Sequence, residues 1–173
     1  PDEARRMLDT AIAVQRADGT PIDSLIVFTY GNAARAASEA NDQVAADSLI
    51  RLGLAAARRG LRADDPVVGT LLSLQAGIHE RLGRAAAADS AYRAMLALRR
   101  RVLGDAHPNT LRGLANHADF LANVGRWPEA AAASREILAQ RGRAIPDEHP
   151  ATAGAVLTLA RALARLDSAP RAV

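Results

Sequence analysis

The chain has 173 residues, of which 49% are hydrophobic but only 3% aromatic. All of its basic residues are Arg and its formal net charge is +3, so the sequence pI of about 10.4 reflects guanidinium chemistry and does not imply nucleic-acid binding. There is no Cys, which excludes a disulfide framework and a thiolate metal site, and no apolar run approaches the ~20 residues of a membrane span.

The apolar share is mostly Ala and Leu, which favours helices, and the sequence lacks the sustained alternation that is typical of strands. An all-α fold of about eight helices is therefore predicted. We expect them near 2–17, 22–38, 43–60, 66–82, 85–102, 108–124, 127–143 and 150–166.

The turn before the second helix, Gly19-Thr20-Pro21, is typical of a helix stop, an N-cap and a first helical residue. The chain opens inside a helical pattern at Pro1, so we expect it to be a segment of a longer protein.

An internal repeat organises these helices. Pro66, Pro108 and Pro150 recur at intervals of 42 residues, and at the same spacing Gly83 aligns with Gly125. Alanines also fall into two columns: Ala34, Ala76, Ala118 and Ala160, and Ala4, Ala46, Ala88, Ala130 and Ala172. Because small side chains let helices approach closely, the columns predict packed helix pairs. The expected array is a single domain with units at 1–23 (partial), 24–65, 66–107, 108–149 and 150–173 (partial).

Apolar residues at three- and four-residue steps predict which face of each helix is buried. In the third unit they are Leu111, Leu114, Ala118 and Leu121 on the first helix, and Ala130, Ser134, Ile137 and Leu138 on the second. The second unit has Ala88, Ala91, Tyr92, Met95 and Leu96 at the corresponding places on its second helix.

Two stretches resemble a known family. One is similar to the junction between repeats of the kinesin-light-chain type of tetratricopeptide (TPR) repeat: Met95-Leu96-Ala97-Leu98-Arg99-Arg100-Arg101-Val102-Leu103-Gly104-Asp105-Ala106-His107-Pro108-Asn109-Thr110-Leu111. The other is similar to that family's turn into the second helix: Gly125-Arg126-Trp127-Pro128-Glu129-Ala130. The resemblance covers essentially the whole chain and is strongest over 66–166.

The resemblance implies a right-handed superhelical solenoid of antiparallel helix pairs, whose first helices line a concave groove that holds a protein or peptide. In bacteria, which the Arg-only, Ala-rich composition suggests as the source, such arrays are often joined to a Ser/Thr kinase, a nucleotide-binding switch or a transcription regulator. The sequence departs from the family at His79 and Ala37, where a bulky residue is usual. Gly53 and Gly77 also lie inside predicted helices, where each costs about 1 kcal/mol of helix stability relative to Ala.

Polar residues on the other face of the first helices are the candidate binding residues. Under the alanine register they are Asn32, Arg35, Glu39, Ser73, Glu80, Arg81, Asn116, Asp119, Asn123, Thr158, Arg161 and Arg165. Asn can both donate to and accept from a peptide backbone, and Arg pairs with carboxylates, so an extended peptide with some acidic character is the expected ligand. The simpler interpretation of any one of them is a solvated polar position on an amphipathic helix.

Neither an enzyme nor a metal or cofactor site is predicted. His107 and His149 precede prolines in the turns and have structural positions, whereas His79 and His117 lack a second ligand at helical spacing. No Gly-rich phosphate loop or nucleophile elbow is present.

Two alternative functions remain open. Nucleic-acid binding could use Arg99-Arg100-Arg101 and Arg58-Arg59, although neighbouring aspartates and the scarcity of aromatics argue for local pairing. Self-association could use the helix 150–166, whose Val156, Leu159, Leu163 and Leu166 need cover. A chain without Cys is compatible with reducing and oxidising compartments, and of these a cytoplasmic location is the expectation.

Overall fold

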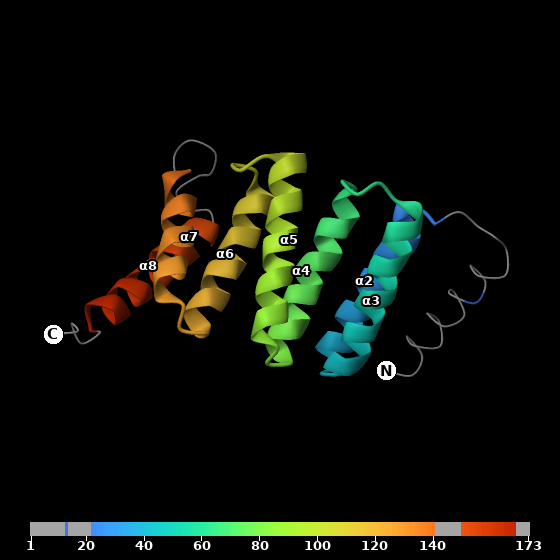
Figure 1. Ribbon diagram of the computed structural model, residues 1–173, viewed down its shortest axis with the longest axis horizontal. Helices are drawn as coiled ribbons and strands as arrows, with labels where there is room; N and C mark the ends of the chain where they lie inside the picture. Colours follow the sequence, from blue (N-terminus) through green and yellow to red (C-terminus); the bar gives the residue numbers. More distant parts are fainter. Residues whose placement is uncertain (1–12, 14–21, 141–149, 169–173) are drawn as a thin grey trace. The chain divides into compact units, whose positions relative to one another are not determined.

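The computed structural model of the chain describes residues 13, 22–140 and 150–168. Over these residues it contains seven α-helices and no strand (Figure 1), which confirms the all-α prediction. The helices are α2 (Ser24–Glu39), α3 (Gln43–Gly60), α4 (Pro66–Arg81), α5 (Ala85–Leu103), α6 (Pro108–Asn123), α7 (Trp127–Ala139) and α8 (Pro150–Asp167). Apart from residue 13, the expected helix over 2–17 lies outside the described residues.

Three of the first helices in the predicted pairs begin in the same way, with a side chain that caps the N-terminus. Asp23 before α2 and Asp65 before α4 each accept a hydrogen bond of 2.9 Å from a backbone N–H in the first turn. His107 does the same before α6 through Nδ1, at 3.1 Å. These bonds satisfy donors that the first helical turn leaves without an intrahelical acceptor.

The start of α2 corrects one prediction. Thr20 and Pro21 were expected as the N-cap and the first helical residue, but Asp23 is the N-cap and the helix begins at Ser24. The carboxylate of Asp23 accepts a hydrogen bond from the backbone N–H of Ile26 and so caps the helix at this position, whereas Thr20 and Pro21 lie outside the described residues.

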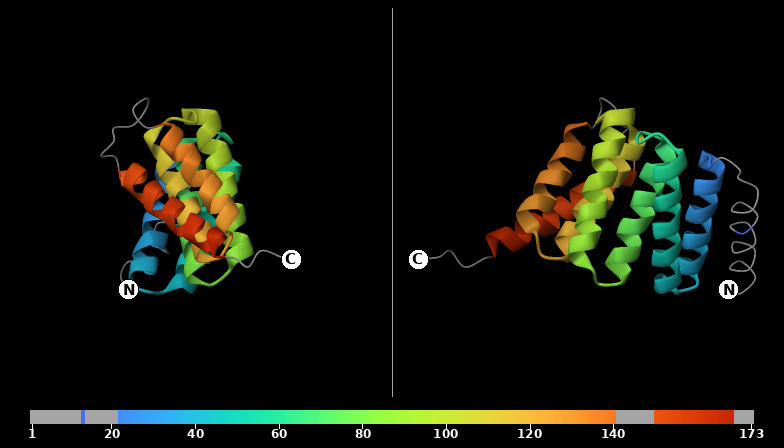
Figure 2. Two further views of the ribbon diagram at one scale, coloured as in Figure 1. Left: turned by 90° about the vertical axis from the view of Figure 1, so that its left-hand side faces the viewer. Right: turned by 45° about the vertical axis from the view of Figure 1, so that its right-hand side comes forward.

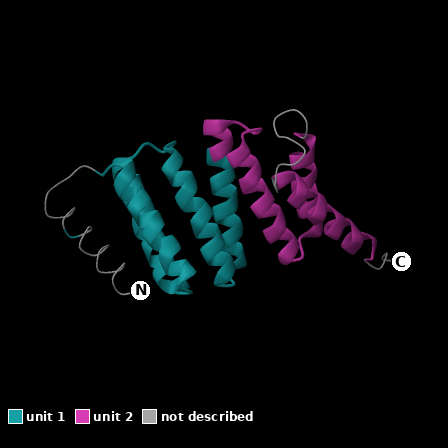
Figure 3. Cartoon of the chain, turned by 180° about the vertical axis from the view of Figure 1, so that it is seen from behind, with its two compact units in different colours: residues 1–98 teal, residues 99–173 magenta. Residues whose placement is uncertain are grey.

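Contacts between Cα atoms divide the chain into two compact units, Pro1–Leu98 and Arg99–Val173 (Figure 3). In unit 1, α2 packs against α3 and α4, and α3 packs against α4. In unit 2, α7 packs against α6 and α8, and α6 also contacts α8. Figure 2 shows the neighbouring helices of each unit from two further directions.

The core of unit 1 lies between α2, α3 and α4. Val27, Ile50 and Leu71, one from each helix, are fully buried. Of the predicted alanine positions, Ala34 and Ala46 are fully buried as well, so the two columns mark packed faces in this unit.

Gly53 of α3 lies against side chains of α2 and α4. A Cβ atom on it would be 2.8 Å from Leu71 Cδ2 and 2.8 Å from Tyr30 Cβ, closer than side-chain atoms approach in real structures. The glycine therefore offsets its unfavourable helix propensity by allowing α2 and α4 to pack tightly on α3. Gly77 of α4 has open space around its Cα, so it has no such function.

The core of unit 2 follows the predicted stripe of α6, in which Leu111, Leu114, Ala118 and Leu121 are all buried. On α7, Ala130, Ser134 and Ile137 are buried as predicted, and Leu138 is half-buried.

The last helix is rotated relative to the prediction. Ala160 was expected in a buried column but is exposed, whereas Ala162 is fully buried and Thr158 is 1% exposed. Among the described residues α8 contacts α6 and α7, and both contacts lie on the side that carries Ala155 and Ala162. Which face of α8 is buried therefore depends on its contacts with α6 and α7 and not on the alanine column of the repeat.

Candidate binding surface

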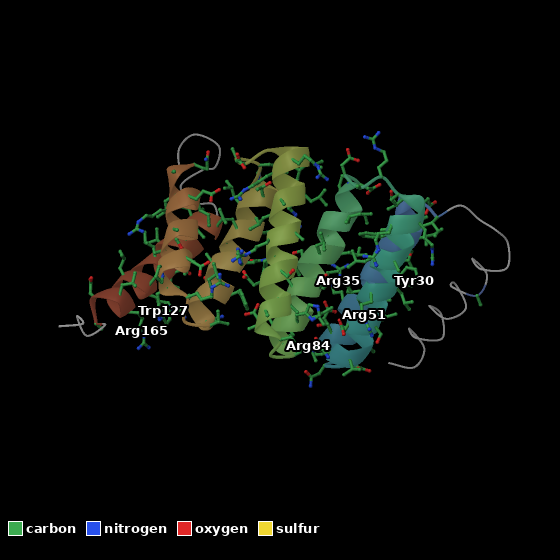
Figure 4. All side chains as sticks on the ribbon, viewed as in Figure 1. Tyr30, Arg35, Arg51, Arg84, Trp127 and Arg165 are labelled. Atoms are coloured by element: carbon green, nitrogen blue, oxygen red, sulfur yellow. The ribbon has the colours of Figure 1, made fainter. Side chains whose placement is uncertain are left out.

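In unit 1 the exposed side of α2 carries polar and apolar residues. Arg35 and Glu39 are exposed as predicted, Asn32 is half-buried, and Arg35 donates a hydrogen bond to Asn32 Oδ1. Arg35 can be followed on α2 in Figure 4. The helical spacing places Leu25 and Phe28, with 70% and 45% of their surface exposed, on the same stripe.

Leu25 and Phe28 are not among the predicted binding residues, which are all polar. Their spacing from Asn32, at i−7 and i−4, is a signal that could have found them. Large exposed apolar side chains beside amides and charges are typical of surfaces that bind proteins, since they supply contact area while the polar groups supply direction.

The candidate residues of α4 diverge. Arg81 is exposed and its Nη1 atom donates to Ser38 of α2, at 2.5 Å to the hydroxyl and 3.3 Å to the carbonyl oxygen. Glu80 accepts a hydrogen bond of 3.1 Å from the hydroxyl of Tyr92 on α5. Ser73 is half-buried. Arg81 thus links the C-terminal ends of α2 and α4, the first helices of two pairs. Glu80 instead contacts α5, the second helix of its own pair.

In unit 2 the candidate residues of α6 share one exposed stripe. Asn116, Asp119 and Asn123 are all exposed, although most of the other residues of α6 are buried. Asn123 Oδ1 accepts a hydrogen bond of 3.3 Å from Arg161 of α8. Asn116 is thus exposed at one end of the stripe, and Asn123 at the other end is exposed but contacts α8.

The candidate residues of α8 differ from one another. Arg161 and Arg165 are exposed, as expected, and the guanidinium of Arg165 lies 5.7 Å from the ring centroid of Trp127 in a cation–π contact (Figure 4). Thr158 was expected to face solvent but is buried and donates a hydrogen bond to Asp119. Its hydroxyl therefore holds α8 against α6 and is not available to a ligand.

A buried carboxylate in unit 1 was not predicted. Asp47 of α3 is 7% exposed, and Oδ2 accepts a hydrogen bond of 2.9 Å from Arg84 Nη1, with Arg51 Nε at 3.9 Å. His79 Nδ1 of α4 lies 4.0 Å from the other carboxylate oxygen of Asp47. Neither of those two atoms makes a hydrogen bond within the described residues. Arg51 and Arg84 can be followed in Figure 4.

Arg99 and Arg100, which were proposed for nucleic-acid binding, make internal contacts. Arg100 forms ion pairs with Asp105, at 3.3 Å, and Glu136, at 2.6 Å. Arg99 donates to the carbonyl oxygen of Asn109, at 2.9 Å. Arg58 and Arg59 are exposed. Internal pairing of Arg100 leaves less free positive charge at this junction than the sequence suggested.

Two arginines have perturbed pKa values. Burial of the Arg99 guanidinium lowers its pKa, and the nearby charge of Arg112 lowers it further. The pKa of Arg62 is raised because Asp64 accepts its hydrogen bonds, at 3.1 Å, and adds a favourable charge. Both guanidinium groups remain charged at neutral pH, so these shifts change local electrostatics and not protonation.

Across the residues that the structure describes, no cluster of three or more His, Cys, Asp or Glu could hold a metal ion. In the same residues, none of the helices combines the length and apolar character that crossing a membrane requires.

Comparisons with known proteins identify the fold. No protein-family model matches the chain, and no curated protein matches it. Two crystal structures of a Podosopora anserina protein described as a kinesin light chain with nearly identical TPR-like repeats are similar, each at 20% identity. Their TM-scores are 0.80 and 0.79, and the match covers 97% of this chain and 79% and 80% of theirs.

The crystal structure of BtubC (BKLC) from P. vanneervenii is also similar, with a TM-score of 0.69 and 20% identity over 99% of this chain and 74% of that one. At this level of identity the comparison defines the fold, and the chain accordingly has a TPR-like helical-repeat fold.

Proposed function

We propose that the chain is a protein- or peptide-binding module, without catalytic activity of its own, that binds its partner on the exposed stripes of its first helices. The observation that carries the proposal is the stripe of α6, where Asn116, Asp119 and Asn123 are exposed on a helix whose other sides are largely buried. Amide side chains at helical spacing can bond the N–H and C=O groups of an extended peptide.

The second support comes from unit 1, where Leu25 and Phe28 add exposed apolar surface to the stripe of Asn32 and Arg35. A partner that uses this stripe would place an apolar side chain against Phe28 and a polar or acidic group near Arg35. In unit 1 the surface thus combines polar groups that would orient a partner with apolar side chains that would add contact area.

We further propose that the repeat is the 42-residue, kinesin-light-chain type and that the source is bacterial. The starts of α2, α4, α6 and α8 at Ser24, Pro66, Pro108 and Pro150, each 42 residues apart, support the repeat length. The Arg-only, Ala-rich composition supports the source.

The test uses peptides selected from a random displayed library on the intact chain, with affinities measured by fluorescence anisotropy. The variant Asn116→Ala/Asn123→Ala should weaken the binding of selected peptides by roughly thirtyfold, since two hydrogen bonds at about 1 kcal/mol each are lost. The control variant, Arg135→Ala, changes an exposed residue of α7 and should leave the affinity unchanged. Equal affinities for all three proteins would exclude the α6 stripe as the binding site.

Self-association is a second candidate, because α8 leaves apolar side chains exposed. Val156 and Leu157 have 50% and 63% of their surface exposed, and Leu163 and Leu166 each have 38%. Light scattering over a concentration series tests this. A dimer that Leu157→Asp converts to monomer would support it, and a monomer at every concentration would rule it out.

A further inference from the structure

The junction between α5 and α6 gathers two guanidinium groups around one residue. Asn109 accepts a hydrogen bond of 2.9 Å from Arg99 through its backbone carbonyl oxygen, and one of 3.0 Å from Arg112 through its side-chain oxygen. The backbone N–H of Asn109 donates in turn to Nδ1 of His107, the N-cap of α6. The position of Asn109 is therefore set from three sides, and it holds both positive charges near the first turn of α6.

The two guanidinium groups carry like charges beside the same residue, and the oxygens of Asn109 that they contact are uncharged. Where the structure describes the chain, neither Arg99 nor Arg112 forms an ion pair, whereas six other arginines each lie within 4.0 Å of a carboxylate. Those paired arginines are Arg51, Arg62, Arg84, Arg93, Arg100 and Arg126. Burial lowers the pKa of Arg99, and the nearby charge of Arg112 lowers it further.

We propose that Arg99 and Arg112 form a binding site for an oxyanion, a carboxylate or a phosphate group. An oxyanion between the two guanidinium groups would remove their mutual repulsion and accept charge-assisted hydrogen bonds from both. Guanidinium groups match the planar geometry of carboxylates and the oxygen spacing of phosphates, which a pair of ammonium groups would not.

The surroundings allow access. Arg112 and Asn109 are exposed, and Arg99 is half-buried. Asn116 lies one turn beyond Arg112 on the same side of α6, so its exposed amide can add a donor at the edge of the site. The site does not depend on the proposed peptide binding, because a free anion is enough to occupy it.

The experiment is an amide NMR titration of the intact chain with inorganic phosphate, and separately with acetate, at constant ionic strength held with sodium chloride. We expect saturable shifts that concentrate at residues 109–116. Stronger binding of phosphate than of acetate identifies a site for phosphate groups, and comparable binding identifies a general carboxylate and phosphate site. The absence of saturable shifts with either anion overturns the proposal.

Two matched variants assign the site. Arg112→Gln removes one guanidinium from an exposed position and should weaken anion binding by roughly tenfold. Arg135→Gln removes an exposed guanidinium from α7 with the same change in net charge and should have no effect. Equal affinities in the two variants would show that the anion responds to net charge alone and would overturn the site. Because Arg112→Gln leaves the bond between Arg99 and Asn109 in place, it tests the site without disturbing the junction.

Discussion

Arg84, in the turn between α4 and α5, donates a hydrogen bond of 2.9 Å to the buried carboxylate of Asp47 on α3. The side chain of Asp47 is 10% exposed and that of Arg84 is 51% exposed. The buried carboxylate is therefore paired with a guanidinium group that lies at the edge of the core. This ion pair joins residues that lie 37 positions apart in the sequence.

Removing Arg84 should therefore destabilise unit 1. Arg84→Ala leaves the Asp47 carboxylate with the more distant Arg51 as its remaining arginine contact, and we expect the free energy of unfolding to fall by about 2 kcal/mol. The expected loss lies below that of a fully buried pair because Arg84 is half-exposed. Urea denaturation followed by circular dichroism measures it. The double variant Asp47→Asn/Arg84→Ala should recover part of the loss, and a loss as large as in the single variant would show that the pair is not coupled.

Two glycines inside helices should respond in opposite directions to the same substitution. Gly53→Ala puts a methyl group 2.8 Å from atoms of Leu71 and Tyr30, so we expect a loss of about 1–3 kcal/mol of stability. Gly77→Ala adds a methyl group in open space and should gain up to about 1 kcal/mol from helix propensity. Thermal unfolding of both variants measures the difference, and a stabilised Gly53→Ala would show that the three helices are not in close contact.

The N-cap positions of α4 and α6 allow a second matched comparison. Asp65→Ala removes the bond to the N–H of Val67 and should cost about 1 kcal/mol. His107→Asp replaces an imidazole cap with a carboxylate, which also interacts favourably with the positive end of the helix, and should gain about 0.5 kcal/mol at neutral pH. Chemical denaturation at low ionic strength gives both values. A destabilised His107→Asp would mean that the imidazole makes contacts beyond the cap.

The contact between Arg165 and Trp127 should stabilise the docking of α8. Arg165→Ala removes a cation from a position 5.7 Å from the ring centroid, and a loss of about 0.5–1 kcal/mol is expected, since both groups are partly accessible to water. Arg165→Lys should retain part of the effect. The measurement is the urea midpoint of the three proteins, and identical midpoints would show that the contact has no energetic weight.

The features that could be predicted from the sequence are those with a local cause. Proline and capping residues mark the starts of α4 and α6, and apolar residues at helical spacing give the buried stripes of α5 and α6. The repeat resemblance leads to the TPR-like fold that the similar structures share. None of these requires knowledge of which helices become neighbours.

The features that could not be predicted depend on distance between helices. Nothing near Asp47 in the sequence indicates that Arg84 and His79 lie against it, and nothing near Gly53 indicates the approach of Tyr30. For the same reason the face of α8 was misassigned. The predicted binding residues stay predictions, except that the burial of Thr158 removes its hydroxyl from the surface.

The distribution of aromatic residues gives each unit its own spectroscopic reporter. Both tyrosines, Tyr30 and Tyr92, lie in unit 1, and Trp127, the sole tryptophan of the chain, lies in unit 2. Selective excitation of the indole therefore follows unit 2, while tyrosine absorbance follows unit 1. A denaturant titration read through both signals separates cooperative unfolding, with coincident midpoints, from stepwise unfolding of two foldons. It does so on the unmodified chain, without any introduced label.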